Sequence, residues 1–217
     1  PMSDRMAAFI AAQGVGTADL ARHPARQPGL YAITTDAAGE RSFTYWREAS
    51  AARTLFADGF GMLAGYDVIY LSAITLAILP PAVRAGLIGA LARFPGRVAF
   101  DSNYRPRLWE DAAAARAAVG ALWGLRPIAL PSLDDEMALF GDGDEATVLA
   151  RLRGLGLREG ALKRGARGPV ALDPGTPDRD FAPAARVVDT TAAGDSFNGA
   201  FLAAHLTGAP TAEALAL

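Results

Sequence analysis

The sequence predicts an α/β fold in which helices cover both faces of a mostly parallel sheet. From residue 67 onward, short apolar runs of strand length alternate with longer apolar runs of helix length. This alternation is typical of parallel sheets, because the connection between two parallel strands usually carries a helix. The chain has 217 residues, of which 51% are hydrophobic, and that is enough apolar material for a sizeable core.

The first third of the chain has a different pattern. A short, largely apolar helix is expected at residues 5–13, and Gly14 ends it. Residues 30–35 and 40–47 alternate with period two around a glycine-bearing turn, which predicts a β-hairpin. These two strands are too rich in Tyr, Thr and Arg for a central core strand. The hairpin is therefore expected to belong to a small sheet that covers something.

The expected core elements follow in a regular order. The strands are residues 68–71, 97–100, 127–130, 160–163, 169–172 and 186–188, and the helices are 82–94, 112–123, about 136–140, 145–153 and about 196–206. The chain starts on a helix and stops in residues 211–217, which the pattern makes the middle of another helix. Edge elements are therefore expected to be missing at both ends.

The composition excludes several classes of partner. Charged residues make up 20% of the chain and the formal net charge is −2, so no electrostatic footprint favours nucleic acid or an anionic membrane. The absence of cysteine excludes disulfides and thiolate metal sites and suits a cytoplasmic protein. No stretch approaches the roughly 20 apolar residues that span a bilayer. An anionic substrate would have to be held locally, by particular Arg, Lys and backbone N–H groups.

The segment 188–197 carries the strongest chemical pattern. An expected strand enters a turn of small residues, and a helix begins. Small residues allow the backbone to approach a ligand, and the first N–H groups of the helix would form an anion hole with Asp195 at its mouth. There Asp195 could accept a proton from an attacking hydroxyl. From spacing alone, Asp195 could equally be a helix N-cap beside a tight glycine turn.

The string Asp-Thr-Thr-Ala-Ala-Gly-Asp at residues 189–195 resembles the second signature of the ribokinase/phosphofructokinase-B family. The resemblance implies that Asp195 is the catalytic base and that the amides of Ala192, Ala193 and Gly194 form the anion hole. Ala192 stands where that family usually has Gly, a change that should leave the N–H donor in place. A monovalent cation near Asp189 would also be in keeping with the resemblance.

The segment 100–109 follows another expected strand. Asn103 could donate to phosphate oxygens, and Arg105 offers a two-pronged donor for phosphate or carboxylate. An ordinary loop with a solvated arginine explains the same residues. The segment resembles the Asp-x-Asn-x-Arg-x-x-Leu-Trp string of the 2-keto-3-deoxygluconate kinases of the same family. That resemblance implies that Asn103 and Arg105 lie between the nucleotide phosphates and the sugar, and Arg105 would also stabilise the transferred group.

Two weaker segments complete the expected nucleotide site. The segment 162–168 reads either as a hairpin turn or, by resemblance, as the nucleotide loop, in which the ATP-binding residues would be Lys163, Gly165, Ala166 and Gly168. The segment 130–136 falls where the family has Asn-x-x-Glu, with Ser132 in place of Asn and Asp135 in place of Glu. Asp135 would organise Mg²⁺ through water, or Ser132 would simply cap a helix with an acidic first turn.

The hairpin is expected to hold the substrate. Tyr45 and Arg47 share a strand face, and Tyr31 could join them across the strand pair. An exposed polar strand face is the plain alternative. Residues 43–53 resemble the lid of the 2-keto-3-deoxygluconate kinases, which implies that Tyr31, Tyr45 and Arg47 hold a sugar acid above Ile74.

Taken together, the resemblances imply a three-layer α/β/α ribokinase-like core at residues 1–28 and 54–217, with a small β lid at residues 29–53. The implied reaction is phosphorylation of the terminal hydroxyl of a sugar acid by ATP and Mg²⁺, giving the 6-phosphate of 2-keto-3-deoxygluconate or of its C4 epimer. The alternatives are another kinase of the family, acting on fructose, ribose or a nucleoside, and a non-catalytic sugar-binding remnant. Pairing of two copies through the lid is a further expectation.

Overall fold

The computed structural model describes residues 2–35, 41–187 and 189–217. The helices are α1 Met2–Ala12, α2 Ala73–Ile78, α3 Pro81–Leu91, α4 Ala112–Gly124, α5 Leu133–Phe140, α6 Glu145–Gly154, α7 Ala193–Leu206 and α8 Thr211–Ala214. The strands are β1 Leu30–Thr35, β2 Arg41–Trp46, β3 Val68–Ser72, β4 Arg97–Asp101, β5 Ile128–Ala129, β6 Ala161–Lys163 and β7 Pro169–Ala171. No helix in these ranges is long and apolar enough to span a bilayer.

The core is built on a mostly parallel sheet. Strands β3, β4 and β5 pair in that order, all parallel. Strand β6 continues the sheet beside β5 through two isolated parallel bridges, Ala129 with Gly160 and Ser132 with Lys163. Strand β7 then pairs antiparallel with β6. The predicted sheet is confirmed, and its parallel part has the carboxyl ends of its strands at one edge.

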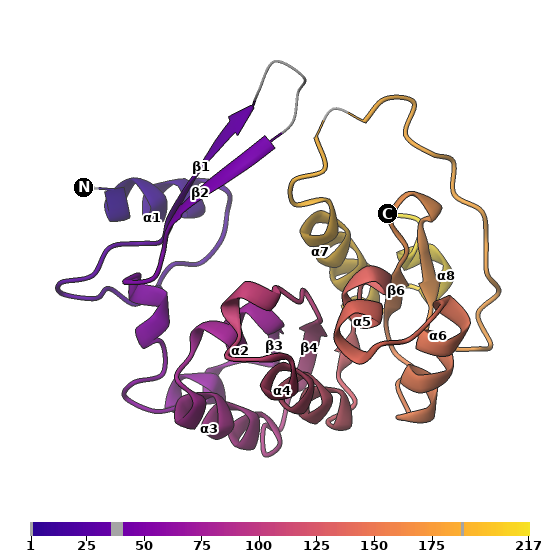
Figure 1. Cartoon of the computed structure of the whole chain (residues 1–217), viewed down its shortest axis with the longest axis horizontal. Coiled ribbons are helices and arrows are strands. Elements are labelled where there is room, and N and C mark those ends of the chain that lie inside the picture. The colour runs from indigo at the N-terminus through magenta and orange to yellow at the C-terminus, as the bar shows by residue number, and fades with distance from the viewer. Residues whose placement is uncertain (1, 36–40, 188) are drawn as a thin grey trace.

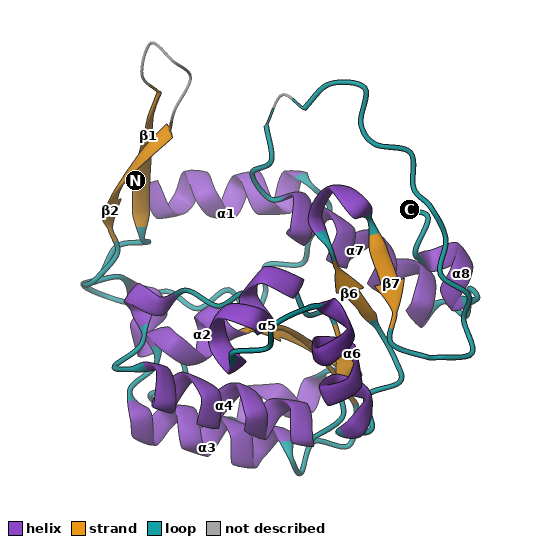
Figure 2. Cartoon of the chain, turned by 45° about the vertical axis from the view of Figure 1, so that its right-hand side comes forward, coloured by secondary structure: helices purple, strands orange, loops and turns teal. Residues whose placement is uncertain are grey.

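Helices cover both faces of this sheet. Successive residues of each strand point to opposite faces, so neighbouring residues pack against different helices. Phe100 and Ala129 pack into a cluster that also contains residues of α3 and α4, whereas Ala99 and Ile128 pack with residues of α7 and α8. Figure 2 shows α3 beside α4 on one side of the core and α7 with α8 on the other. The predicted three-layer α/β/α arrangement is confirmed.

The hairpin of β1 and β2 is also confirmed. The strands are antiparallel, and the register places Leu30 opposite Trp46 and Tyr31 opposite Tyr45. The hairpin projects from the core in both cartoon views (Figures 1 and 2). The turn predicted at residues 36–39 lies outside the described residues.

One predicted strand is absent, and one helix was missed. Arg186 and Val187 are exposed and not in a strand, while residue 188 lies outside the described part. A strand needs a neighbour for its backbone hydrogen bonds, and no described strand pairs with this segment. Helix α2 was not predicted, because its six residues are all apolar except Thr75 and are too few for a helical period to be recognised.

Candidate active site

The turn that precedes α7 presents backbone donors to solvent. Asp189 accepts a hydrogen bond from the Thr191 amide (2.7 Å), and the first regular bond of the helix runs from the Ser196 N–H to the Ala192 carbonyl (2.8 Å). Among the described residues, the N–H groups of Ala192, Gly194 and Asp195 have no hydrogen-bond partner. Unpaired amides at a helix N-terminus attract anions, and the helix dipole adds to that attraction.

The arrangement differs in one respect from the predicted anion hole. The amide of Ala193 donates to the Thr190 carbonyl (3.2 Å), so it is used within the turn. Asp195 supplies an additional amide that the sequence did not single out. The carboxylate of Asp195 lies in the first turn of α7 and is exposed. A proton acceptor and at least two open N–H donors therefore share one exposed helix terminus.

The residues after β4 lie at the carboxyl edge of the sheet. The backbone N–H of Asn103 donates to Asp101 Oδ1 (3.1 Å). The side-chain Oδ1 atom of Asn103 is buried and has no hydrogen-bond partner among the described residues. Arg105 donates to the Tyr104 carbonyl (2.8 Å) and forms an ion pair with Asp135 (3.3 Å). The structure thus brings Arg105 together with Asp135, two residues that the sequence assigned to different tasks.

Asp135 lies in the first turn of α5 and is largely buried. Burial raises the pKa of its carboxyl, and the nearby Arg105 guanidinium opposes that rise. The amide of Ser132 donates to Ser102 Oγ (3.1 Å), and the Ser132 side chain makes no capping hydrogen bond to α5. The plain explanation of Ser132 as a side-chain cap is therefore not supported.

The segment after β6 carries the predicted nucleotide loop. Gly165 and Ala166 lie in a single 3₁₀ turn at Gly165–Arg167, and Gly168 follows at a φ of 73°. A Cβ atom at Gly168 would collide with the ring of Phe181, so both conformation and space call for glycine there. Lys163 points inward, where its ammonium contacts Asp101 (2.8 Å) and Asn198 (3.1 Å).

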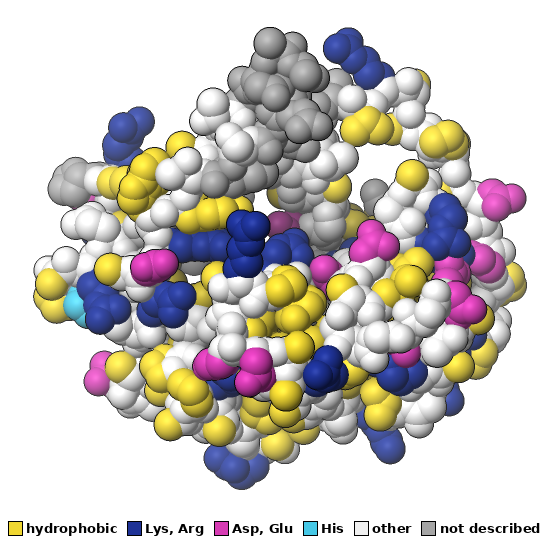
Figure 3. Space-filling model, viewed as in Figure 1, with side chains coloured by type: hydrophobic (Ala, Val, Ile, Leu, Met, Phe, Trp, Pro, Cys, Tyr) yellow, Lys and Arg dark blue, Asp and Glu magenta, His cyan; other side chains and the backbone are white. Residues whose placement is uncertain are grey.

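The hairpin side chains gather as predicted. The rings of Tyr31 and Tyr45 lie 6.1 Å apart, and the guanidinium of Arg47 lies 4.1 Å from the centre of the Tyr45 ring. Ile74 is half-buried in the first turn of α2, directly after β3. Basic side chains gather below the hairpin on the face that Figure 3 shows, an arrangement that suits anionic ligands.

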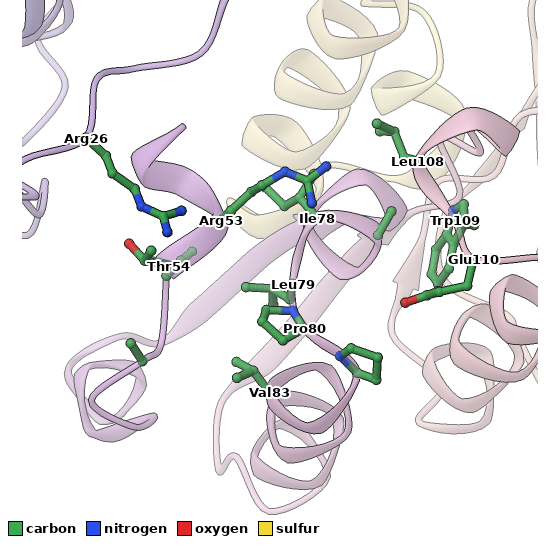
Figure 4. Close-up of a pocket in the computed structure, with 14 residues that line it drawn as sticks. Arg26, Arg53, Thr54, Ile78, Leu79, Pro80, Val83, Leu108, Trp109 and Glu110 are labelled. Carbon is green, nitrogen blue, oxygen red and sulfur yellow. The ribbon is translucent and has the colours of Figure 1, made fainter. Parts of the chain in front are cut away.

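A cavity of about 640 Å³ lies away from these residues. It is lined by the segment after the hairpin, the end of α2 with the start of α3, and residues 108–110. Figure 4 shows Arg53 together with Pro80 and Trp109 around it. None of the residues predicted for the site lines this cavity, so its volume says nothing about the chemistry at Asp195.

Two buried residues and one exposed tyrosine near the site were missed. Asp101, Asn198 and Tyr70 are joined by hydrogen bonds beneath the turn before α7. The spacing held one usable signal, because Asn198 follows Asp195 by three residues and so lies on the same helix face. Tyr70 could not have been found, because its contact with Asn198 joins residues far apart in the sequence.

The described residues suit Mg²⁺ held mainly through phosphate. No group of three or more His, Cys, Asp or Glu that could hold a metal lies in the described part of the chain, so no protein cage is present there. The carboxylate of Asp135 and the unpartnered Oδ1 of Asn103 offer hard oxygen atoms. Mg²⁺ prefers oxygen ligands and keeps several waters when it binds with phosphates, so these residues fit it.

Comparisons with known proteins identify the family of the chain. A family model described as pfkB family carbohydrate kinase matches residues 1–217. The 2-dehydro-3-deoxygluconokinase of Dickeya dadantii is 41% identical over 224 residues, which cover 98% of this chain and 72% of that protein. The enzyme of the same name from Escherichia coli K12 is 39% identical over 214 residues, covering 93% and 69%.

The fold has a close match among solved structures. The fructokinase of Vibrio cholerae O395 with fructose, ADP and calcium bound has a TM-score of 0.81 at 22% identity, covering 99% of this chain and 72% of that one. The likeness at this identity concerns the fold. The resemblance inferred from residues 189–195 and 100–109 is confirmed, and the chain belongs to the pfkB family of carbohydrate kinases.

Proposed function

We propose that this chain transfers the γ-phosphoryl group of ATP to the terminal hydroxyl of 2-keto-3-deoxygluconate, the compound also called 2-dehydro-3-deoxygluconate. The products would be the 6-phosphate and ADP. The observation that carries the proposal is the helix terminus where the Asp195 carboxylate adjoins the open amides of Gly194 and Asp195. The names of the relatives that are 39–41% identical support the substrate.

Asp195 accepts the proton of the attacking hydroxyl, and the oxygen then forms its bond to the γ-phosphorus as the bond to the ADP oxygen breaks. Charge spreads over the equatorial oxygens of the transferred group. The N–H groups of Ala192 and Gly194, with the Arg105 guanidinium, stabilise that charge. Ala193 joins them if its bond to Thr190 opens.

The nucleotide lies along the carboxyl edge of the sheet, over the residues Asn103, Ser132, Lys163, Gly165, Ala166, Gly168 and Gly194. Asp135 would hold Mg²⁺ through water, and a monovalent cation would lie near Asp189. When bound, Mg²⁺ neutralises charge on the phosphate oxygens. Because Arg105 is paired with Asp135 in this structure, the arginine has to leave that pair to reach the transferred group.

The hairpin, residues 29–53, acts as a lid on the core formed by residues 1–28 and 54–217. Tyr31, Tyr45 and Arg47 hold the sugar acid from above, with Ile74 and Arg105 below it. The two phenols can hydrogen-bond the hydroxyls of the sugar acid, and the guanidinium can bind its carboxylate. The same exposed hairpin could join two copies of the chain.

The substitution Asp195→Asn tests the chemical step. It keeps the shape of the side chain and removes the proton acceptor. We expect kcat to fall about 10²–10⁴-fold, the usual contribution of a general base, while ADP binding measured by calorimetry changes less than about 3-fold.

The matched control is Asp173→Asn, in a turn after β7 where the carboxylate accepts hydrogen bonds from Gly175 and Thr176. This variant should keep the wild-type kcat. A wild-type kcat in Asp195→Asn would show that Asp195 is not the base.

A further inference from the structure

A buried polar cluster lies directly beneath the proposed catalytic turn. The Lys163 ammonium contacts Asp101 Oδ2 (2.8 Å) and Asn198 Oδ1 (3.1 Å). The Asn198 amide nitrogen donates to Asp101 Oδ2 (2.7 Å) and to the Tyr70 hydroxyl (3.1 Å). Asp101 and Asn198 are 2% and 1% exposed, so the centre of the cluster is in the interior, while Tyr70 at its outer end is 44% exposed.

The chemistry of the partners fixes how Asn198 is oriented. Its oxygen faces an ammonium, which only donates, and its nitrogen faces a carboxylate, which only accepts. The reversed amide would place donor against donor and acceptor against acceptor. The Asn198 side chain therefore forms these hydrogen bonds in only one arrangement of Lys163 and Asp101, and both residues must be in place.

The cluster joins four separate elements at the carboxyl edge of the sheet. Tyr70 comes from β3, Asp101 from β4, Lys163 from β6 and Asn198 from α7. A buried charge pair contributes little net stability on average, because desolvation offsets the attraction, but it is costly to break. Such a cluster resists displacement of α7 along the sheet more than it adds to the free energy of unfolding.

The cluster also lies close to Gly194 and Asp195, the residues proposed to act on the transferred group. The Lys163 ammonium lies 3.8 Å from the position that a Cβ atom on Gly194 would take. Asn198 lies one helical turn after Asp195 on the same face of α7. Burial raises the pKa of Tyr70 to about 12, and the negative charges of Asp101 and Asp195 add to the rise.

We propose that Asn198, held by Lys163 and Asp101, is a positioning residue that fixes the first turn of α7 relative to the end of β4. It thereby sets the distance between Asp195 with its open amides and the segment of Asn103 and Arg105. Displacement of a catalytic group by about 1 Å can cost about 10²-fold in rate. This inference rests on the proposed kinase function.

The test is Asn198→Ala, which removes the amide and leaves the Asp101–Lys163 pair. We expect kcat to fall at least about 10-fold, with the KM values for ATP and the sugar acid within about 3-fold of wild type. Tyr70→Phe removes only the outermost contact of the cluster. It should fold like the wild type and lower kcat by about 2- to 5-fold, in line with the loss of one hydrogen bond of ordinary strength.

The matched control is Phe201→Leu, a buried change on α7 that touches none of the cluster residues by hydrogen bond. It loosens the packing of the same helix and should leave kcat within about 3-fold of wild type. If Phe201→Leu lowers kcat as much as Asn198→Ala at an equal loss of Tm, the cluster has only a structural role.

A second readout separates this inference from the proposed function. Hydrogen exchange of the amides in residues 193–198 should be faster in Asn198→Ala than in Phe201→Leu at equal Tm, whether or not the protein turns over a sugar. A wild type inactive on every sugar but showing this exchange pattern would overturn the function and keep the positioning role. An active wild type with unchanged kcat and exchange in Asn198→Ala would overturn the positioning role alone.

Discussion

At the scale of single residues, the backbone of the turn before α7 explains why its residues are small. Ala192 is the N-cap of α7 and has a φ of 59° and a ψ of 14°, the left-handed region. Only glycine adopts this conformation without steric cost. The Gly usual at this position in the family therefore serves the backbone, and the sequence predicted the open donor here without predicting the strained angle.

Replacing Ala192 by Gly should relieve this strain. The left-handed conformation costs an alanine about 1–2 kcal/mol, and the greater freedom of glycine when unfolded offsets part of the gain. We expect Ala192→Gly to raise the free energy of unfolding by about 0.5–1 kcal/mol, measured by urea denaturation.

The neighbouring residue offers the control. Ala193 is the first residue of α7, so Ala193→Gly should lower the free energy of unfolding by about 0.5–1 kcal/mol. Equal destabilisation by both substitutions would contradict the left-handed conformation of Ala192.

At the scale of elements, the proposed site depends on how α5 is held at the sheet edge. Glu136 is fully buried in the first turn of α5, next to Asp135, and accepts a hydrogen bond from Arg151 of α6 (2.9 Å). Arg151 also pairs with Asp142 in the link between the helices. Arg151 thus joins α5 to α6 and fixes the helix that carries the proposed Mg²⁺ residue.

The titration of Glu136 should make the stability of the contact between α5 and α6 depend on pH. Burial raises the pKa of Glu136 from 4.5 to about 6 against the opposing effect of Arg151. The folded state therefore holds this proton more tightly than the unfolded state does. The contribution of Glu136 to the free energy of unfolding falls by about 2 kcal/mol as the pH rises from about 4.5 through about 6.

The variant Glu136→Gln does not titrate and should lack this component. Both proteins are denatured with urea between pH 4 and pH 7.5, about the range in which the group titrates. The difference between their free energies of unfolding should change with pH across this range. Asp144→Asn is the control, since hydrogen bonds from Thr147 hold the pKa of Asp144 below its usual value and its contribution should stay nearly constant above about pH 5. A pH-independent difference for Glu136→Gln would show that Glu136 titrates normally.

At the scale of the whole molecule, the sequence predicted what depends on local pattern. Alternating apolar runs predicted β3, β4 and α4, and the small-residue string predicted that Asp195 lies near the start of a helix. Contacts between segments far apart in the chain could not be predicted from local pattern. The ion pair of Arg105 with Asp135 exists only because the fold brings the end of β4 beside α5, and the cluster around Asn198 only because it brings β4, β6 and α7 together.

Length and capping also limited the prediction. Helix α2 has only six residues, which is too short for a helical period to show. The start of α7 was placed three residues late, because Ala193 to Asp195 look like a loop of small residues until the left-handed Ala192 is known to cap the helix. That error concerned the very residues whose amides form the proposed anion hole.

The most direct test of the central claim is ADP release with ATP and Mg²⁺ on 2-keto-3-deoxygluconate, measured beside fructose, ribose and gluconate. Arg47 and the paired tyrosines favour an acid that also carries several hydroxyls. We expect kcat/KM for the keto-deoxy acid to exceed that for each other sugar by at least about 100-fold, because a site built for hydrogen-bonding groups rejects analogues that lack them. Equal or faster turnover of fructose or ribose, or no turnover of the keto-deoxy acid, would contradict the account.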